Sequence, residues 1–276
     1  GAVIRDLGLS NVSISGSGIA YVGALVAYDN GGSNANNGTL IKNVHVTSGS
    51  VATTGTNAAG GLVGNLYEFS KITNSSSYAT VESLYTAGGL VGQIYGGKIE
   101  NSFSAGNVTT SETGGYGTGG IAGYVHDGDD DDTASSFRNI YAIGNVTGVG
   151  DTPTGGLIGQ NRGVGTTVNS AYASGFVTGS TVTGGILGKL HSSGTITLTG
   201  VYFDTTITGQ LHQRSGGTNT TGAISNANAY LTPSYLFFDF TSTGAWFSVE
   251  GYTRPFLRME WTPVVSNAHE LQMLSS

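Results

Sequence analysis

The sequence predicts an all-β fold: a right-handed parallel β-helix (β-solenoid) with about three short strands per coil and a C-terminal aromatic-rich cap or junction. Three observations support this. A glycine-rich phrase recurs about every thirty residues, short alternating apolar and polar stretches follow it, and glycine makes up 47 of 276 residues. Glycine costs about 1 kcal/mol per interior helix position relative to alanine, so these segments disfavour helices. Stacked short strands with glycine corners fit the repeat.

The first repeated element, the glycine phrase, reads Gly-Gly-(Leu/Ile)-apolar-Gly and occurs five times after a degenerate copy at 23–27. The steps between successive second positions are 37, 28, 31, 36 and 29 residues. We expect its glycines to form corners and to let the opposite wall of the coil approach closely. The predicted structural residues are Gly61, Leu62, Gly64, Gly89, Leu90, Gly92, Gly120, Ile121, Gly123, Gly156, Leu157, Gly159, Gly185, Ile186 and Gly188.

The second element, the asparagine phrase, follows the glycine phrase and is clearest at 99–108 and 137–146. Because Ile99, Asn101 and Phe103 are spaced by two, they are predicted to lie on one face of a strand. Stacked coils about 4.8 Å apart would then align the asparagines in an internal amide ladder that satisfies buried polar groups. The residues of this ladder are Asn43, Asn74, Asn101 and Asn139.

Composition divides the chain into three parts. Residues 1–210 hold the repeats and predict the solenoid shaft, with about seven coils. Residues 211–229 are rich in Gly, Ser, Thr and Asn and predict a polar loop. Residues 230–276 include both tryptophans and predict a C-terminal cap or junction that covers the open end of the stack. The alternative for this aromatic end is a carbohydrate-binding platform.

Charge and hydropathy argue against several partners. The net charge is −7 and the ten basic residues are scattered, so we expect no nucleic acid partner. No apolar run approaches the ~20 residues of a membrane-spanning helix, and we expect no direct membrane insertion. The chain has no cysteine, which excludes a disulfide framework and a thiolate metal site.

An acidic loop follows His126 and is the main cluster of like charges. Carboxylates gathered on a loop suit Ca²⁺, which takes six to eight oxygen ligands, so the candidate metal ligands are Asp127, Asp129 and Asp131. The spacing does not follow the EF-hand pattern and no glutamate closes the loop, so a solvated acidic loop is the alternative. We expect no other cofactor.

Residues suited to catalysis are not grouped. A β-helical polysaccharide-degrading enzyme would need paired carboxylates, or Ca²⁺ with basic residues, whereas the carboxylates outside the acidic loop are isolated. We therefore expect a non-enzymatic protein. The alternatives are a purely structural or ice-binding solenoid, a polysaccharide-degrading enzyme, and a Ca²⁺-dependent carbohydrate-binding module. Threonine pairs keep no constant register, which disfavours ice binding.

The glycine phrases at 61–64, 89–92, 156–159 and 185–188, with the linked asparagine phrase, resemble the GLUG repeat. That repeat occurs in large bacterial surface proteins, such as filamentous-haemagglutinin-like adhesins exported by two-partner secretion, and in non-catalytic regions of IgA-protease-family proteins. The resemblance covers about residues 1–210 and carries over no catalytic residue. It implies an extracellular β-helical shaft at the bacterial cell surface. Residues 265–274 resemble the opening of another unit, so we expect a longer chain.

These observations predict a non-catalytic segment of an exported bacterial surface adhesin or fibre. Its expected partners are a host or bacterial cell-surface protein or glycan, or further copies of itself in fibres. We expect the contacts in the loops at 28–40, 111–118 and 127–135, or in the aromatic end.

Overall fold

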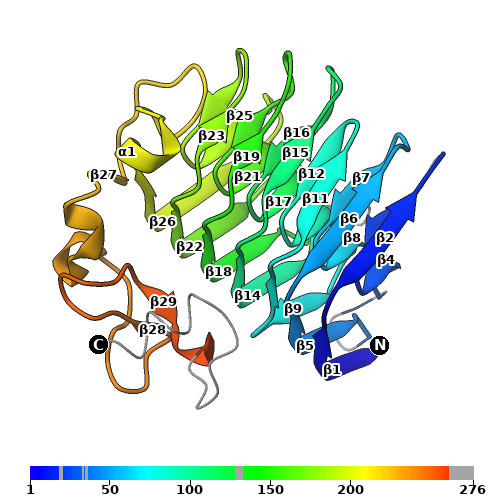
Figure 1. Cartoon of the computed structure of the whole chain (residues 1–276), viewed down its shortest axis with the longest axis horizontal. Coiled ribbons are helices and arrows are strands. Elements are labelled where there is room, and N and C mark those ends of the chain that lie inside the picture. Colours follow the sequence, from blue (N-terminus) through cyan, green and yellow to red (C-terminus); the bar gives the residue numbers. More distant parts are fainter. Residues whose placement is uncertain (19–20, 33, 35–36, 128–132, 261–276) are drawn as a thin grey trace.

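Parallel strands stacked in register form most of the molecule. The computed structural model describes residues 1–18, 21–32, 34, 37–127 and 133–260. Strand follows strand from β1 at the N-terminal end to β26 near the other end (Figure 1). The strands pair in parallel with the same segment of the neighbouring coil. The predicted all-β solenoid is therefore confirmed.

Sheet A forms one long wall of the stack. Each coil begins with a strand of sheet A, so the coils are numbered 1 to 7 in the order of these strands. Coil 3 has a split strand, β9 and β10, and β27 adds a short strand after coil 7. The strands of sheet A are β1 (Val3–Leu9), β5 (Leu40–Val46), β9 (Lys71–Thr73), β10 (Ser76–Ser77), β14 (Lys98–Ser104), β18 (Ser136–Ala142), β22 (Thr166–Ala173), β26 (Ile196–Asp204) and β27 (Ala223–Ile224).

Three further sheets, B, C and D, each contribute one strand to coils 1–6. Sheet B comprises β2 (Val12–Gly16), β6 (Gly49–Thr53), β11 (Thr80–Ser83), β15 (Val108–Thr110), β19 (Val146–Thr147) and β23 (Val177–Thr178). Sheet C comprises β3 (Val22–Gly23), β7 (Ala58–Gly60), β12 (Thr86–Gly88), β16 (Gly117–Gly119), β20 (Thr154–Gly155) and β24 (Thr183–Gly184). Sheet D comprises β4 (Val26–Tyr28), β8 (Val63–Leu66), β13 (Val91–Tyr95), β17 (Ala122–His126), β21 (Ile158–Asn161) and β25 (Leu187–Leu190).

Each complete coil has four strands, where the sequence predicted about three. The glycine phrase is not a single strand: its first residue ends a strand of sheet C and its fourth begins a strand of sheet D, so the chain turns between them. In coil 3, a Cβ at Gly88 or Gly89 would overlap backbone oxygens, and one at Gly92 would lie 2.6 Å from the Gly64 oxygen. Sheets C and D therefore fold against each other at backbone contact distance, which side chains would prevent.

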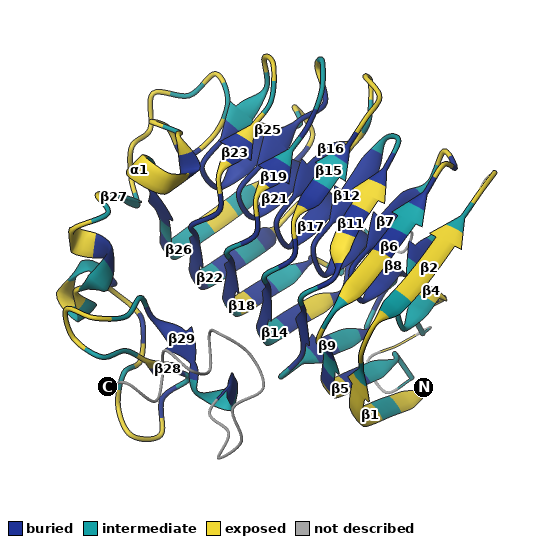
Figure 2. Ribbon diagram, viewed as in Figure 1, coloured by how far each residue is buried: buried dark blue, intermediate teal, exposed yellow. Residues whose placement is uncertain are grey.

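An apolar core runs the length of the stack. In sheet A, Ile41, Ile72, Ile99, Phe137 and Val168 pair position by position and are fully buried. They pack with Leu62, Leu90 and their equivalents from the glycine phrases in one cluster. Burial is deepest in the middle coils, whereas β1 and β2 at the N-terminal end carry many exposed residues (Figure 2). One coil buries its inner face only through its neighbours.

The asparagine ladder lies on the outer face of sheet A and not inside the coil, so the prediction of an internal ladder is wrong. Asn43 is exposed and Asn74, Asn101 and Asn139 are half-buried. All four adopt left-handed backbone conformations, with φ between 46° and 54°, a region that asparagine tolerates better than most residues. Each such residue interrupts the strand alternation. Hence Ile99 enters the apolar core, whereas Phe103, two residues beyond Asn101, joins a separate cluster.

Amide hydrogen bonds link parts of this outer ladder. Asn43 Nδ2 donates to Asp6 Oδ1 over 2.8 Å, and Asn139 Nδ2 donates to Asn101 Oδ1 over 2.9 Å. Gly200 occupies the same position in coil 7, with φ of 60°. Backbone conformation, more than buried polarity, therefore selects the residue at this position.

Residues 225–260, here called the C-terminal segment, lie against the outer face of sheet A (Figure 1). The sequence placed residues 230–276 over the open end of the stack, and the described part of that region is on the flank instead. Its elements are η1 (Asn228–Tyr230), η2 (Thr232–Ser234), β28 (Trp246–Phe247), β29 (Phe256–Leu257) and η3 (Arg258–Glu260). Outward-facing aromatic rings of sheet A provide the surface that it covers.

The chain between coil 7 and the C-terminal segment partly closes the end of the stack. Asp204 caps the short helix α1 (Thr205–Thr208) by accepting hydrogen bonds from Thr206 and Ile207 backbone N–H groups. The loop then reaches sheets C and D, where the Ile186 and Leu187 N–H groups donate to the Gln213 carbonyl. This loop, expected to be a simple polar connection, therefore covers part of the last coil.

Candidate functional site

Six tyrosines form a continuous surface where the strands of sheet C begin and those of sheet D end. Four belong to sheet D or follow it directly, and two precede strands of sheet C. This tyrosine cluster comprises Tyr21, Tyr28, Tyr67, Tyr95, Tyr116 and Tyr124. It belongs to neither of the two hydrophobic clusters of the described residues. Core packing therefore does not account for it.

Ring contacts join the tyrosines in two groups, one within coil 1 and one across coils 2–4. Tyr67 stacks on Tyr95 with ring centroids 5.4 Å apart, and Tyr95 meets the edge of Tyr124 at 6.4 Å. Tyr116 stacks on Tyr124 at 4.7 Å, and Tyr21 contacts Tyr28 at 5.4 Å. Aromatic pairs at such distances are worth about 0.5–1.5 kcal/mol beyond the area that they bury. The rings therefore hold one another in place.

A buried amide joins the coil 1 tyrosines to the group in coils 2–4. The hydroxyl groups of Tyr21 and Tyr95 both donate to Gln93 Oε1, over 3.4 and 3.1 Å. Gln93 is 3% exposed and lies in β13 between Asn65 and Tyr124 of the adjacent strands. Two phenols on one amide oxygen fix the ring orientations in advance of any ligand.

The cluster combines tyrosines whose ring faces are exposed with tyrosines that are buried. Tyr28 is 49% exposed and Tyr116 is 53% exposed, whereas Tyr124, on which Tyr116 stacks, is 3% exposed. Burial raises the pKa values of Tyr21, Tyr95 and Tyr124, and for Tyr95 the neighbouring phenols add to this effect. These three phenols therefore stay neutral hydrogen-bonding groups at physiological pH. The surface offers apolar faces rimmed by neutral polar atoms.

A histidine and an arginine border the cluster on its coil 4–5 side. The His126 ring lies 5.2 Å from Tyr95 and 5.7 Å from Tyr124, and Arg162 hydrogen-bonds the Tyr124 side chain. Arg162 directly follows β21 in the next coil.

Two buried carboxylates adjoin the coil 1–2 side of the cluster: Asp29 follows Tyr28 and accepts the Tyr67 backbone N–H over 3.4 Å, and Glu68 follows Tyr67. The exposed ring faces themselves carry no charge, so a ligand with a neutral body fits them.

Sequence reasoning missed this cluster, although a signal was present. Tyr28 and Tyr124 come one residue after a glycine phrase, and Tyr67 and Tyr95 come three residues after one. Positions one and three after the turn share a face of a strand. Tyr21 and Tyr116 precede the glycine phrase in coils 1 and 4, the coils of Tyr28 and Tyr124. Only the folded stack brings them to the same surface as the tyrosines that follow the phrases.

The acidic loop is described only in part. Asp129 and Asp131 lie outside the described residues. Asp127 is half-buried, and its Oδ1 accepts a hydrogen bond from the Val164 backbone N–H of the next coil. One of the three candidate Ca²⁺ ligands thus has a structural role between coils. Within the described ranges, His and acidic side chains form no group of three or more that could hold a metal ion.

Most described aromatic residues of the C-terminal segment take part in its packing. Trp246 is fully buried, and its ring lies 4.3 Å from Phe238 and about 6 Å from Tyr141 and Tyr172 of sheet A. Trp246 Nε1 donates to Asn139 Oδ1 over 3.2 Å. Phe237, Phe247 and Tyr252 remain exposed. The aromatic richness that suggested a binding platform reflects an internal interface.

Buried polar contacts also hold this segment. The Tyr141 hydroxyl donates to Glu260 Oε2 and the Tyr172 hydroxyl donates to the Pro255 carbonyl, both over 2.7 Å. Arg254 pairs with Asp204 at 2.6 Å, and the Asp204 side chain is 1% exposed. Burial raises the pKa values of Tyr141 and Tyr172 well above their ordinary value. The interface is thus closely packed and locked by hydrogen bonds.

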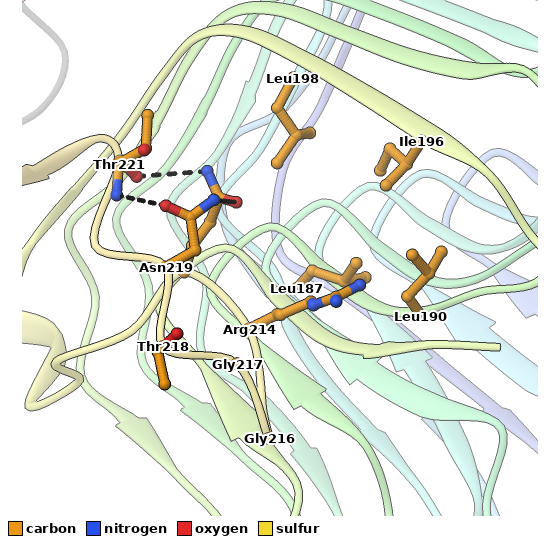
Figure 3. Close-up of a pocket in the computed structure, with 11 residues that line it drawn as sticks. Leu187, Leu190, Ile196, Leu198, Arg214, Gly216, Gly217, Thr218, Asn219 and Thr221 are labelled. Atoms are coloured by element: carbon orange, nitrogen blue, oxygen red, sulfur yellow. Dashed lines mark hydrogen bonds between the residues drawn. The ribbon is translucent and has the colours of Figure 1, made fainter. Parts of the chain in front are cut away.

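A cavity of about 580 Å³ opens where coil 7 lacks strands of sheets B, C and D. Figure 3 shows Leu187 and Leu190 of β25 and Ile196 and Leu198 of β26 on its wall, with Arg214 extending beside the leucines. The loop after α1 forms the opposite side through Gly216–Thr218 and Asn219. The cavity follows from incomplete closure of the last coil, because β26 has no strands of its own coil opposite its apolar side chains.

Comparisons with known proteins find one motif and two partial relatives. The family model described as the GLUG motif matches residues 83–109, which hold the glycine phrase of coil 3 and the asparagine phrase of coil 4. An immunoglobulin A1 protease from Streptococcus sanguinis is 36% identical over 162 residues, covering 54% of this chain and 8% of the protease. Halomucin from Haloquadratum walsbyi is 36% identical over 93 residues, covering 33% of this chain and 1% of halomucin. The chain thus spans less than a tenth of either relative.

None of the described helices is long and apolar enough to cross a lipid bilayer.

Proposed function

We propose that this chain is a non-catalytic segment of a large exported bacterial surface adhesin or fibre. In this proposal the solenoid is a stiff extracellular shaft whose side carries contact surfaces for cell-surface protein or glycan, or for further copies of the chain. The GLUG motif supports the proposal, as does similarity to short parts of two much longer proteins. The solenoid fold is compatible with a spacer that extends by adding coils.

The observation that carries the proposal is the unbroken register of the stack. In sheet D the fourth residue of each glycine phrase pairs with its equivalent in the next coil, from Val26 through Val63, Val91 and Ala122 to Ile158 and Leu187. One core passes through these coils without a domain boundary. A rod of this kind resists bending, because bending would open paired strands on one side.

Three of the four buried carboxylates of the described residues make structural contacts, which supports a non-catalytic role. Asp204 caps α1 and pairs with Arg254, Glu260 accepts from the Tyr141 hydroxyl, and Asp29 accepts from the Thr39 hydroxyl over 2.6 Å. Glycoside hydrolysis uses two carboxyl groups that flank one bond. The three carboxylates named here serve separate structural contacts.

Adhesion of coated beads tests the proposal. Beads carrying the full chain would be washed over bacterial and epithelial cell layers and over a layer of immobilised chain. Beads carrying the heat-unfolded chain are the matched control. We expect retention of the folded-chain beads on at least one layer. Equal retention of both bead types, or none, would show that the folded segment is not adhesive. Antibody labelling of intact producing cells tests the extracellular location separately.

A further inference from the structure

We propose that the tyrosine cluster is a binding site for a linear, uncharged glycan, whose sugar rings lie on the exposed faces of Tyr28 and Tyr116. This inference rests on the proposed function, since it names the ligand class that the shaft would contact. It places the contact on the side of coils 1–4 and not in the aromatic C-terminal segment, where Tyr235, Phe238, Trp246 and Phe256 are buried.

Ring geometry supports a sugar ligand. A pyranose ring has an apolar face of C–H groups and a rim of hydroxyl groups, so it matches a surface of aromatic faces with polar edges. Tyr116 stacks on Tyr124, and Tyr67 stacks on Tyr95, with interplanar angles of 24° and 20°. These two stacks lie over neighbouring strands, linked by the Tyr95–Tyr124 contact. The surface therefore presents repeated aromatic units to a ligand that is itself a repeat.

Preorganisation strengthens this argument. Tyrosine has few side-chain torsions, so ordering it on binding costs little entropy. In this cluster that cost is already met, because Gln93 Oε1 holds the hydroxyl groups of Tyr21 and Tyr95 and Arg162 bonds Tyr124. Rigid sites lose less free energy on binding than flexible ones do.

Strand pairing disfavours a peptide ligand at this place. A peptide that binds a β-sheet commonly adds a strand to an open edge and gains main-chain hydrogen bonds. Strands β8, β13 and β17 are each paired on both sides, so they offer no open edge. Side-chain faces are what remains for a ligand to contact.

Charge disfavours nucleic acid and strongly anionic glycans. The net charge of the chain is −7, and the phosphates of nucleic acid need several cations. The ring faces and Gln93 carry no charge, and the cationic Arg162 lies at one end. The buried carboxylates Asp29 and Glu68 adjoin the other end and would repel an anion. A neutral glycan needs no counter-charge along its length.

Isothermal titration with linear hexasaccharides of glucose, mannose and N-acetylglucosamine tests the inference on the full chain. We expect at least one probe to bind. We expect Tyr116→Ala and Tyr28→Ala each to weaken its binding at least tenfold, and Tyr116→Phe to stay within about threefold of wild type because the ring face is kept. Tyr252→Ala removes a tyrosine that is 81% exposed on the C-terminal segment, and it is the matched control with unchanged affinity.

Unchanged thermal midpoints would show that the variants remain folded. Binding that survives both alanine substitutions would overturn the inference and place the glycan site elsewhere. If no probe binds while coated beads still adhere, the tyrosine cluster is not a neutral-glycan site and the adhesive function stands. If neither assay responds, both proposals fail.

Discussion

Replacing Gly89 with alanine tests whether the corner between sheets C and D is as tight as its geometry indicates. A Cβ at this position would overlap the Gly120 backbone oxygen in coil 4 and Ser104 Oγ in sheet A. Neither neighbour can move away easily, because Gly120 lies in a hydrogen-bonded corner and Ser104 in the paired strand β14. The added methyl group must therefore push two coils apart or shift the corner away from sheet A.

The expected loss follows from this overlap. Forcing extra atoms into a packed interior costs about 1–3 kcal/mol and occasionally more, and a clash with backbone belongs at the upper end, so we expect about 3 kcal/mol for Gly89→Ala. At about 2–4 °C per kcal/mol for large domains, the thermal midpoint falls by about 6–12 °C. Urea unfolding followed by circular dichroism measures the free energy of unfolding directly.

Gly8→Ala is the matched control. Gly8 lies in β1, is exposed, has no heavy atom within 4 Å of an added Cβ and lacks a positive φ. Alanine there reduces the entropy of the unfolded chain, which stabilises a protein by about 0.4–1 kcal/mol. The two substitutions should thus differ in sign. A Gly89→Ala variant within about 0.5 kcal/mol of the Gly8→Ala variant would refute the close contact between coils.

Four further outcomes follow from the structure. Trp246→Ala should destabilise docking of the C-terminal segment by about 3–5 kcal/mol, and limited proteolysis should then cut within residues 225–260 while the coils stay intact. Asn101→Val should cost at least about 1–2 kcal/mol because its left-handed φ of 46° disfavours branched residues, and Asn101→Gly should cost less in the same urea titration. Burial raises the folded-state pKa values of Tyr141 and Tyr172 above the ordinary 10.0, so the unfolded chain loses these protons first and stability should fall as pH rises past 10; phenolate absorbance that appears together with unfolding would confirm it, and earlier ionisation would contradict it. Calcium should leave the thermal midpoint unchanged, since Asp127 already serves as an acceptor between coils, and a calcium-dependent rise would identify a metal site.

The coil was predictable because its determinants are local and repeated. Each glycine phrase marks the same corner, so the spacing of Gly61, Gly89 and Gly120 along the sequence is the spacing of coils along the stack. The number of strands per coil was less accessible. A five-residue phrase with alternating apolar residues looks like one strand until the backbone contacts at its glycines are known.

The side on which residues lie was predictable only where the backbone is regular. Period-two reasoning assigned Ile99, Asn101 and Phe103 to one face, and the left-handed residue Asn101 broke that rule. Asparagine at a fixed position fits both a buried ladder and a left-handed turn. The exposed fraction of the asparagine side chain distinguishes a buried ladder from a left-handed turn, and this fraction cannot be read from the sequence.

Long-range assembly was beyond reach from the sequence. Trp246 donates a hydrogen bond to Asn139, which lies more than a hundred residues earlier in the chain. The sequence around either residue gives no sign of this contact. The same holds for Tyr21 and Gln93 in the tyrosine cluster. Aromatic residues near the C-terminus predicted an interface correctly in kind, but its partner surface was hidden in the outward positions of the repeats.

The course of the C-terminal segment has a mechanical consequence. From coil 7 the chain returns toward the N-terminal end, contacting Tyr202 in coil 7, Ser170 in coil 6 and Tyr141 in coil 5. A bare solenoid under tension can lose its terminal coils one at a time, since each is held by a single neighbour. Here the segment straps three coils together, so pulling on coil 7 loads coil 5 as well. The first rupture from this end should therefore release several coils in one step, at a higher force than peeling a single coil would need.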